Sequence, residues 1–369
     1  MSNWPVWLPI REDLRELTAY GAPQLEVPTR LNTNENPYGP SKALISDIAE
    51  SLRTIAENLN RYPDRDALEL RAALVSYVNG SCGVDLTVAQ TWAANGSNEV
   101  IQQIFQAFGG HGRTALGFVP SYSMHSIIAR TTGTNWIDGH RDSDFTLSAS
   151  SAISQITQSR PHLVFVTSPN NPTGTAVSLE TQEAIIKAAR EIGALVVVDE
   201  AYAEFARAGT ISAITLVTDH PNVLVTRTMS KAFAMAGTRL GYLLAHSSVV
   251  DALMIVRLPY HLSSVTQGVA LTALKHTDEL LATVDAIKVQ RDRIANELRA
   301  MGYQPVPSDA NFVLFGPLAD AKATWAALLA RGVLVRDVGL PGLLRVTAGT
   351  EAETTAFLEA LEEISQETK

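Results

Sequence analysis

The sequence predicts an α/β protein with a large domain, built on a mostly parallel sheet covered by helices, and a smaller α/β domain. The chain has 369 residues, which is long for a single hydrophobic core. Between residues 114 and 245, short apolar runs alternate with helical stretches, as in parallel strands buried on both faces. In the C-terminal third the order of apolar runs and helical stretches changes, which indicates a second domain.

The expected organisation has three parts. Residues 1–30 form an N-terminal arm that packs with the small domain, residues 31–266 the large domain and residues 267–369 the small domain. Within the arm we expect a short helix around 11–19 and then a segment punctuated by Pro23 and Pro28.

The elements follow from periodicity and turn residues. Helical spacing predicts helices at 41–59, 67–78, 97–108, 266–276, 277–301, 321–331 and 352–365. Apolar runs predict strands at 91–94, 114–118, 162–167, 194–198, 223–226 and 242–245, and in the small domain at 311–315, 333–336 and 344–347.

Composition excludes several functional classes. A net charge of −9 leaves no basic field for nucleic acid or an anionic membrane. Cys82 is the single cysteine, so internal disulfides and thiolate metal clusters are excluded, and the eight histidines show no metal-binding spacing, so no metal is expected. No apolar run approaches the ~20 residues of a membrane span, and the N-terminus lacks the apolar core of a signal peptide, so we expect a cytoplasmic protein.

Polar residues are concentrated just after the predicted strands. Ligands of such sheets bind beyond the carboxyl ends of the strands. The segments at these ends are Pro120-Ser121-Tyr122, Ser168–Gly174, Asp199–Tyr202 and Ser230-Lys231. The helix that begins at Ser97 follows Gly96 and offers free backbone N–H groups to an anion.

Lys231 lies in an apolar, small-residue stretch, and Arg239 follows eight positions later. Apolar surroundings and a second cation lower the pKa of an amine and prepare it to attack carbonyls. Thr228, Ser230 and Arg239 are groups that hold a phosphate. Together they suggest a pyridoxal 5′-phosphate Schiff base, and the alternative for this stretch alone is a surface lysine with a structural arginine.

Asp199 supports the cofactor interpretation. It ends the apolar run 194–198, and a carboxylate at the end of a buried strand requires a cationic partner. The protonated ring nitrogen of the cofactor is such a partner, and the pair lets the ring accept electrons.

With these residues in order, the chain resembles the fold-type I pyridoxal-phosphate-dependent (class II) aminotransferases, in particular the histidinol-phosphate aminotransferase branch. The resemblance covers nearly the whole chain. It rests on residues 34–38, 61–63, 95–99, 120–122, 168–174, 198–202, 230–239, 311–315 and 344–347.

The resemblance implies catalytic and ring-binding roles. Lys231 would form the Schiff base and then move the proton between substrate and cofactor, while Asp199 pairs with the ring nitrogen. Asn171 and Tyr202 would hydrogen-bond the ring hydroxyl group, and Tyr122 would stack on the ring.

The resemblance also implies a phosphate site shared between two subunits. The expected ligands in one subunit are Ser97, Asn98, Thr228, Ser230 and Arg239. Tyr62 is expected to reach the phosphate from the neighbouring subunit, which makes a homodimer part of the active site.

Substrate binding is assigned by resemblance to Arg345, Arg336, Tyr20 and Asn36. Two arginine forks suit a phosphate in one half-reaction and carboxylates in the other. The implied substrates are histidinol phosphate, glutamate and 2-oxoglutarate, in histidine biosynthesis. A structural alternative is that Arg336 pairs only with Asp337 or Asp309.

Other functions stay open on the sequence alone. An aromatic amino acid aminotransferase acting on phenylalanine would present a similar ring to the pocket. More remote are a phosphothreonine decarboxylase-like enzyme and a non-catalytic aminotransferase-like binding domain. The last would need an added DNA-binding segment, for which the short, non-basic arm leaves no room.

Overall fold

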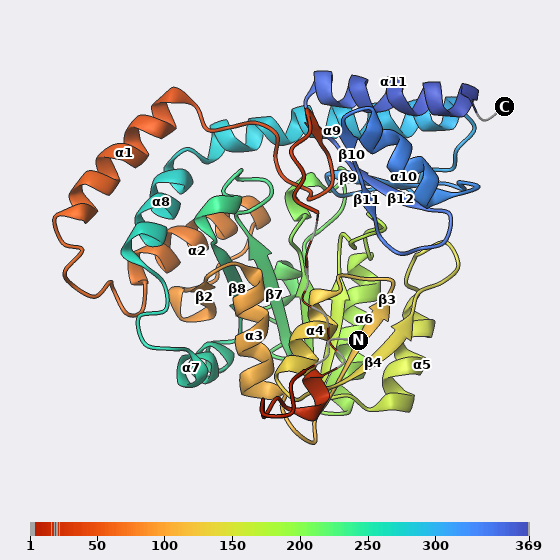
Figure 1. The fold of residues 1–369 in the computed structure, drawn as a ribbon. Coiled ribbons are helices and arrows are strands. Elements are labelled where there is room, and N and C mark those ends of the chain that lie inside the picture. The colour runs from red at the N-terminus through yellow and green to blue at the C-terminus, as the bar shows by residue number, and fades with distance from the viewer. Residues whose placement is uncertain (1–3, 16, 18, 20, 22, 368–369) are drawn as a thin grey trace.

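The computed structural model describes residues 4–367 except 16, 18, 20 and 22. Its centre is a seven-stranded sheet flanked by helices, with a smaller α/β layer beside it (Figure 1). The predicted fold class is confirmed.

The large sheet is parallel except for one strand. Its order is β2 (Thr91–Ala94), β8 (Gly241–Ala245), β7 (Val223–Thr228), β6 (Leu195–Asp199), β5 (Leu163–Thr167), β3 (Thr114–Val119) and β4 (Asn135–His140). β8 is antiparallel to both of its neighbours, while the pairs from β7 to β4 are parallel. The start of β8 therefore lies at the same edge as the ends of the other strands.

Both faces of this sheet are buried, which explains the continuous apolar runs. Along β6, Val196 and Val198 pack into one hydrophobic cluster and Val197 into the other. The first cluster also takes apolar residues of α2 (Leu68–Cys82), α5 (Ala149–Ser159) and α6 (Leu179–Glu191). The second takes those of α3 (Ser97–Phe108), α4 (Met124–Thr131) and α7 (Ser247–Val256).

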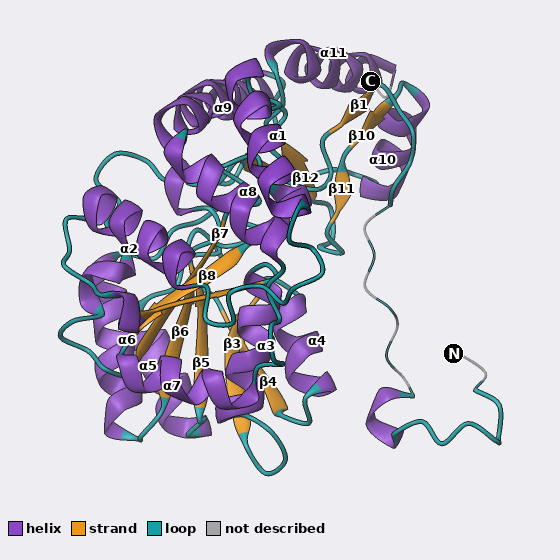
Figure 2. Ribbon diagram, turned by 90° about the vertical axis from the view of Figure 1, so that its left-hand side faces the viewer, coloured by secondary structure: helices purple, strands orange, loops and turns teal. Residues whose placement is uncertain are grey.

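The C-terminal part forms its own layer (Figures 1 and 2). An antiparallel sheet in the order β11 (Arg336–Asp337), β12 (Leu344–Thr347) and β9 (Phe312–Phe315) packs with α9 (Thr277–Ala300), α10 (Ala321–Ala330) and α11 (Glu351–Glu367). α1 (Lys42–Ala56) lies beside α8 (Ser264–Lys275). The boundary expected between residues 266 and 267 falls inside α8.

The N-terminal arm touches both layers. β1 (Thr29–Arg30) pairs in parallel with β10 (Val333–Leu334) of the small layer. Nearer the N-terminus, the Arg11 Nη1 group donates to the carbonyl oxygen of Thr131 at the end of α4, at 3.0 Å. Short 3-10 turns complete the chain: η1 (Glu12–Leu14), η2 (Val88–Gln90), η3 (Ala203–Phe205), η4 (Ala213–Leu216) and η5 (Ala236–Thr238).

Three details differ from the expectation. Among the described residues of 11–19, only the turn η1 is helical. β4 was not expected, since Asn, Asp and Gly interrupt its apolar pattern at the edge of the sheet. The strand expected at 333–336 is divided between β10 and β11, which belong to different sheets. No helix in the described part of the chain has the length and apolar character to span a membrane.

Candidate active site

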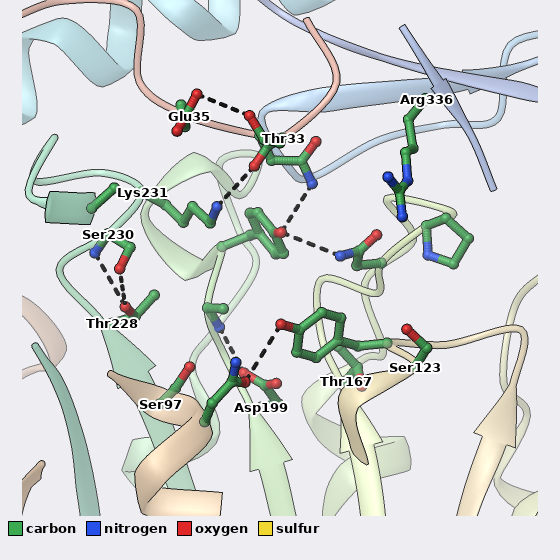
Figure 3. Close-up of a pocket in the computed structure, with 18 of the residues that line it drawn as sticks. Thr33, Glu35, Ser97, Ser123, Thr167, Asp199, Thr228, Ser230, Lys231 and Arg336 are labelled. Carbon is green, nitrogen blue, oxygen red and sulfur yellow. Dashed lines mark hydrogen bonds between the residues drawn. The ribbon is translucent and has the colours of Figure 1, made fainter. Parts of the chain in front are cut away.

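A cavity of about 500 Å³ lies at the carboxyl edge of the large sheet, between it and the small layer (Figure 3). It gathers residues that the sequence singled out on separate segments. Those that line it are Ser97, Asn98, Tyr122, Asn171, Asp199, Tyr202, Thr228, Ser230, Lys231, Arg239, Arg336 and Arg345.

The topology brings α3 and β8 together at one end of this cavity. Gly241 begins β8 against the start of α3, so closely that a Cβ atom there would overlap the backbone nitrogen of Ser97. Gly96 has a φ of +82°, and a Cβ atom on it would lie 2.7 Å from the Arg239 Nη2 atom. Only glycine fits both positions, and the backbone thereby leaves room for an anion at the helix N-terminus.

Hydroxyl groups and a guanidinium extend this anion-binding end. The Thr228 Oγ1 group donates to Ser230 Oγ at 3.0 Å, and Arg239 Nη1 lies 3.5 Å from the same oxygen. Arg239 itself is exposed, at the rim of the cavity. Backbone N–H groups of a helix start, hydroxyl groups and an arginine together form a phosphate-binding donor set.

Lys231 projects between the two layers, and its Nζ group donates to the carbonyl oxygen of Thr33 at 3.1 Å (Figure 3). Burial lowers the pKa of Lys231 to about 8. Arg345 and, more weakly, Arg239 lower the pKa further, while Glu35 opposes them. The expected depression of the pKa is confirmed, although Arg345 is the more effective cation.

Asp199 lies at the deep end of the cavity. Its Oδ2 atom is 2.9 Å from Nε2 of His125, and its Oδ1 atom accepts from the backbone N–H of Ala201 at 3.2 Å. Both side chains of the pair are buried. The ring of Tyr122 meets that of His125 edge-on, 5.4 Å between centroids. The carboxylate is thus fixed in orientation and directed toward the cavity.

Tyr202 connects the two layers through asparagines. Its hydroxyl oxygen accepts from Asn34 Nδ2 at 3.0 Å and from Asn171 Nδ2 at 3.4 Å. Asn171 Oδ1 in turn accepts from Arg345 Nη1 at 2.5 Å, and Asn34 Oδ1 accepts from Thr347 Oγ1 at 3.0 Å. Tyr202, which follows β6 of the large sheet, is therefore linked through Asn171 and Asn34 to Arg345 and Thr347 on β12 of the small sheet.

The two arginines of the small sheet are placed differently. Arg345 is buried, donates from Nη2 to the carbonyl oxygen of Asn32 at 2.8 Å and lies over the ring of Phe312. Arg336 lines the cavity, and no hydrogen bond or ion pair joins its guanidinium to any residue that the structure describes. Asp309 instead accepts from the Arg207 backbone N–H at 2.7 Å, and Asp337 accepts from Gly339. The alternative in which Arg336 pairs only with these aspartates is not what the structure contains.

Three predicted residues are not among those lining the cavity. Asn36 donates to the Ala232 carbonyl oxygen and to Thr283 Oγ1, and lines a smaller adjoining cavity. Tyr62 is 80% exposed and stacks on Tyr260, with 4.4 Å between centroids. Tyr20 lies outside the described residues. Their roles stay predictions.

Sequence reasoning missed His125 and the partners supplied by residues 33 and 34. An isolated histidine in an apolar helix resembles an ordinary core residue, and only its position three residues after Tyr122 gives a hint. Thr33 acts through its backbone carbonyl, which side-chain patterns do not reveal. Among the described residues, no group of three or more His, Cys, Asp or Glu side chains could hold a metal ion.

Comparison with known proteins decides the family. Residues 27–361 match the family model described as aminotransferase class I and II. The chain belongs to this aminotransferase family.

Among class I and II aminotransferases, similar relatives are the histidinol-phosphate aminotransferase of Frankia casuarinae, 59% identical over 97% of this chain and 91% of the relative, and that of Thermobifida fusca, 58% identical over 96% and 95%. The solved histidinol-phosphate aminotransferase of Sinorhizobium meliloti, in complex with pyridoxal 5′-phosphate, superposes with a TM-score of 0.81 at 24% identity, covering 93% of this chain and 92% of the other. That likeness supports the fold.

The residues of this aminotransferase fit pyridoxal 5′-phosphate, the cofactor of the family. The glycine-shaped donor set around Ser97, Ser230 and Arg239 suits its phosphate. Asp199, fixed by His125, offers a carboxylate for the ring nitrogen, and Lys231 has the lowered pKa that attack on an aldehyde requires. When bound, the cofactor supplies an aldehyde that carries the amino group and a ring that accepts electrons.

Proposed function

We propose that this chain is a pyridoxal-5′-phosphate-dependent histidinol-phosphate aminotransferase. It exchanges an amino group between histidinol phosphate and 2-oxoglutarate, with imidazole-acetol phosphate and glutamate as the products, in histidine biosynthesis. The similarity to curated histidinol-phosphate aminotransferases, 55–59% identity over at least 95% of this chain, supports this function.

Each proposed role uses a group at a known position. Lys231 holds the cofactor and moves a proton at its Nζ atom. Asp199 would pair with the ring nitrogen and keep it protonated, while Asn171 and Tyr202 would hydrogen-bond the ring oxygen. Tyr122 would stack on the ring. These roles are consistent with the burial of Asp199 and with the hydrogen bond between Asn171 and Tyr202.

The observation that carries the substrate assignment is the pair of arginines on the small sheet. Arg345, already engaged by Asn171 and Asn32, binds a carboxylate, while Arg336 is available for a second anion. A substrate pair with a phosphate on one member and carboxylates on the other uses both forks.

Steady-state kinetics test the substrate. Glutamate is the amino donor, and imidazole-acetol phosphate and phenylpyruvate are compared as acceptors. We expect a higher kcat/KM for imidazole-acetol phosphate. Equal values, or a preference for phenylpyruvate, would favour an aromatic amino acid aminotransferase. Release of carbon dioxide without a keto acceptor would indicate a decarboxylase.

We also propose a homodimer in which Tyr62 of one subunit reaches the phosphate site of the other. The exposure of Tyr62 and its absence from the cavity of its own chain support this arrangement. A cytoplasmic location, expected from the sequence, is proposed with it.

A further inference from the structure

A buried ion cluster lies on the face of the large sheet opposite the cavity. Along β7, Thr228 lines the cavity and Arg227 points to the other face, because neighbouring side chains in a strand alternate. At the end of β6, the side chain of Asp199 lines the cavity and that of the next residue, Glu200, points to the other face. Arg227, Glu200 and Glu204 meet on the reverse face, each with less than a tenth of its side chain exposed.

One guanidinium joins both carboxylates. Arg227 Nη2 donates to Glu200 Oε2 at 2.8 Å and Nε to the same oxygen at 3.1 Å, while Nη1 lies 3.3 Å from Glu204 Oε1. The Glu200 carboxylate also accepts hydrogen bonds from Ser212 Oγ and from the Ala213 backbone N–H, each at 2.7 Å. Burial alone would lower the pKa of Arg227, but the two carboxylates raise it well above its ordinary value.

The positions of these residues along the chain give the cluster its significance. Tyr202 lies two residues after Glu200 and two before Glu204, so both neighbours that flank it are held by Arg227. Asp199 directly precedes Glu200. Lys231 follows Arg227 by four residues, after the end of β7.

We propose that Arg227, through its fork to Glu200 and Glu204, is a positioning residue that sets Asp199 and Tyr202 relative to Lys231. The proposal rests on the proposed function, because it assigns these three residues to the reaction. Arg227, Glu200 and Glu204 do not line the active-site cavity, so their effect on the reaction is through the geometry of the residues next to them in the chain. Misplacement of reacting groups by about 1 Å can cost about 100-fold in rate.

The proposal separates two kinetic quantities. Arg336 and Arg345, which bind the substrate anions, lie on β11 and β12 of the small sheet. The link from Arg345 to the cluster is indirect, through Asn171 and Tyr202, and Arg345 is also held by the carbonyl oxygen of Asn32. Loosening the cluster should therefore slow the chemical step and leave substrate affinity nearly unchanged. A merely structural role would reduce the amount of folded enzyme and change neither quantity in the enzyme that remains.

The experiment compares Arg227→Lys with Arg71→Lys in the holoenzyme. Lysine keeps the charge and loses the fork. Arg71 is an equally buried arginine that donates to the carbonyl oxygens of Thr91 and Val88, outside the cavity. The readout is the single-turnover rate of the bound cofactor with glutamate at varied concentrations, together with thermal unfolding.

We expect both variants to unfold at lower temperature. Only Arg227→Lys should lower the maximal rate, by about 10-fold or more, with half-saturation by glutamate changed by less than about 2-fold. The proposal is overturned if Arg227→Lys keeps the wild-type rate, or if its half-saturation concentration rises as much as its rate falls.

Glu200→Gln covers the case in which Arg227→Lys does not fold. Its amide keeps the shape but has one carbonyl oxygen for the four donor groups from which Glu200 now accepts. The rate should therefore fall more than in Glu204→Gln, where the contact with Arg227 is longer. A wild-type rate in Glu200→Gln would contradict the proposal.

Using glutamate alone keeps this test separate from the substrate assignment. If the wild type reacts with glutamate and not with histidinol phosphate, the proposed substrate fails and the positioning test still stands. If the wild type reacts with neither, the affinity of the same variants for pyridoxal 5′-phosphate tests the proposal instead. We then expect Arg227→Lys to lose more affinity than Arg71→Lys, and Glu200→Gln more than Glu204→Gln.

Discussion

Arg336 and Arg345 lie directly opposite one another in the antiparallel pair of β11 and β12, so both side chains leave the sheet on one face. Two like charges in such a pair repel each other, and an anion between them relieves the repulsion. The two arginines differ in their hydrogen bonds. Arg345 is held by Asn171 and Asn32, whereas Arg336 has no such partner among the described residues.

Arg336→Ala should weaken the binding of the phosphorylated substrate much more than the binding of glutamate. Loss of charge-assisted hydrogen bonds costs about 1.5–3 kcal/mol, so the KM for histidinol phosphate should rise roughly 10- to 100-fold. Since no bond within the described structure is lost, the unfolding free energy should change by less than about 0.5 kcal/mol. Steady-state kinetics and denaturant unfolding measure both. A uniform loss for both substrates would point to a structural role instead.

The uptake of pyridoxal 5′-phosphate by the apoprotein should depend on pH through Lys231. Only the neutral amine attacks an aldehyde, so the rate should rise with pH and level off above about 8. Arg345→Gln removes the cation that depresses this pKa most, so the midpoint should move to higher pH. Stopped-flow absorbance records the uptake, and Arg336→Ala, which lacks this influence, serves as the control. An unchanged midpoint in Arg345→Gln would rule out the electrostatic explanation.

The same pKa affects stability in the apoprotein. Between pH about 8 and 10.5 the unfolded state binds more protons at Lys231 than the folded state does. The cost of burying the charge is therefore greatest below pH 8 and fades as the pH rises through this window. Lys231→Met should remove this rise, which urea unfolding at several pH values would detect. Parallel curves for wild type and variant would contradict it.

Gly96→Ala should weaken cofactor binding by moving Arg239. The new methyl group would meet the guanidinium at 2.7 Å, in a backbone conformation that costs about 1–3 kcal/mol for a residue with a side chain. We expect roughly a 10-fold loss of affinity for pyridoxal 5′-phosphate, measured by equilibrium titration. Gly83→Ala at the end of α2, which also has a positive φ (+66°) and where a methyl group meets nothing within 4 Å, is the matched control. Equal affinity for pyridoxal 5′-phosphate in the two variants would show that Gly96 does not contribute to the phosphate site.

Subunit mixing tests the shared site. Lys231→Ala should abolish turnover and Tyr62→Ala should weaken the phosphate site of the neighbouring subunit. In a mixed dimer, one site carries both changes and the other carries neither. Unfolding and refolding equal amounts together should therefore restore one wild-type site per mixed dimer. Cofactor affinity no better than that of Tyr62→Ala would show that Tyr62 does not act across subunits.

The arrangement of the sheet could be predicted from sequence because its strands are buried on both faces. Val196, Val197 and Val198 form an uninterrupted apolar run only because helices cover both sides. β4 escaped prediction because an edge strand is half solvated, and Asn135 and Asp138 are compatible with that position. The sequence predicted one strand where the structure has β10 and β11. The chain passes from one sheet to the other within four residues, and no turn residue marks the change.

The candidate site divides along similar lines. Residues such as Lys231 and Asp199 stand at the ends of recognisable strands, so local sequence indicates them. His125 and Asn34 belong to the site because they contact Asp199 and Tyr202, which lie 74 and 168 positions away in the chain. A single sequence does not reveal such contacts. Arg345 was expected to bind substrate, yet its influence on the pKa of Lys231 depends on how the two layers meet.

The reversed direction of β8 has a consequence for folding. Gly241 meets Ser97, and Arg239 meets Gly96, only after β8 has been inserted between β2 and β7. The donor groups of the proposed phosphate site are therefore not brought together in the unfolded chain. A cofactor that binds only the native state adds to stability in proportion to the logarithm of its concentration, about 2.7 kcal/mol at 100 times its Kd. The supply of vitamin-derived cofactor therefore helps to determine how much of this protein survives as folded chain.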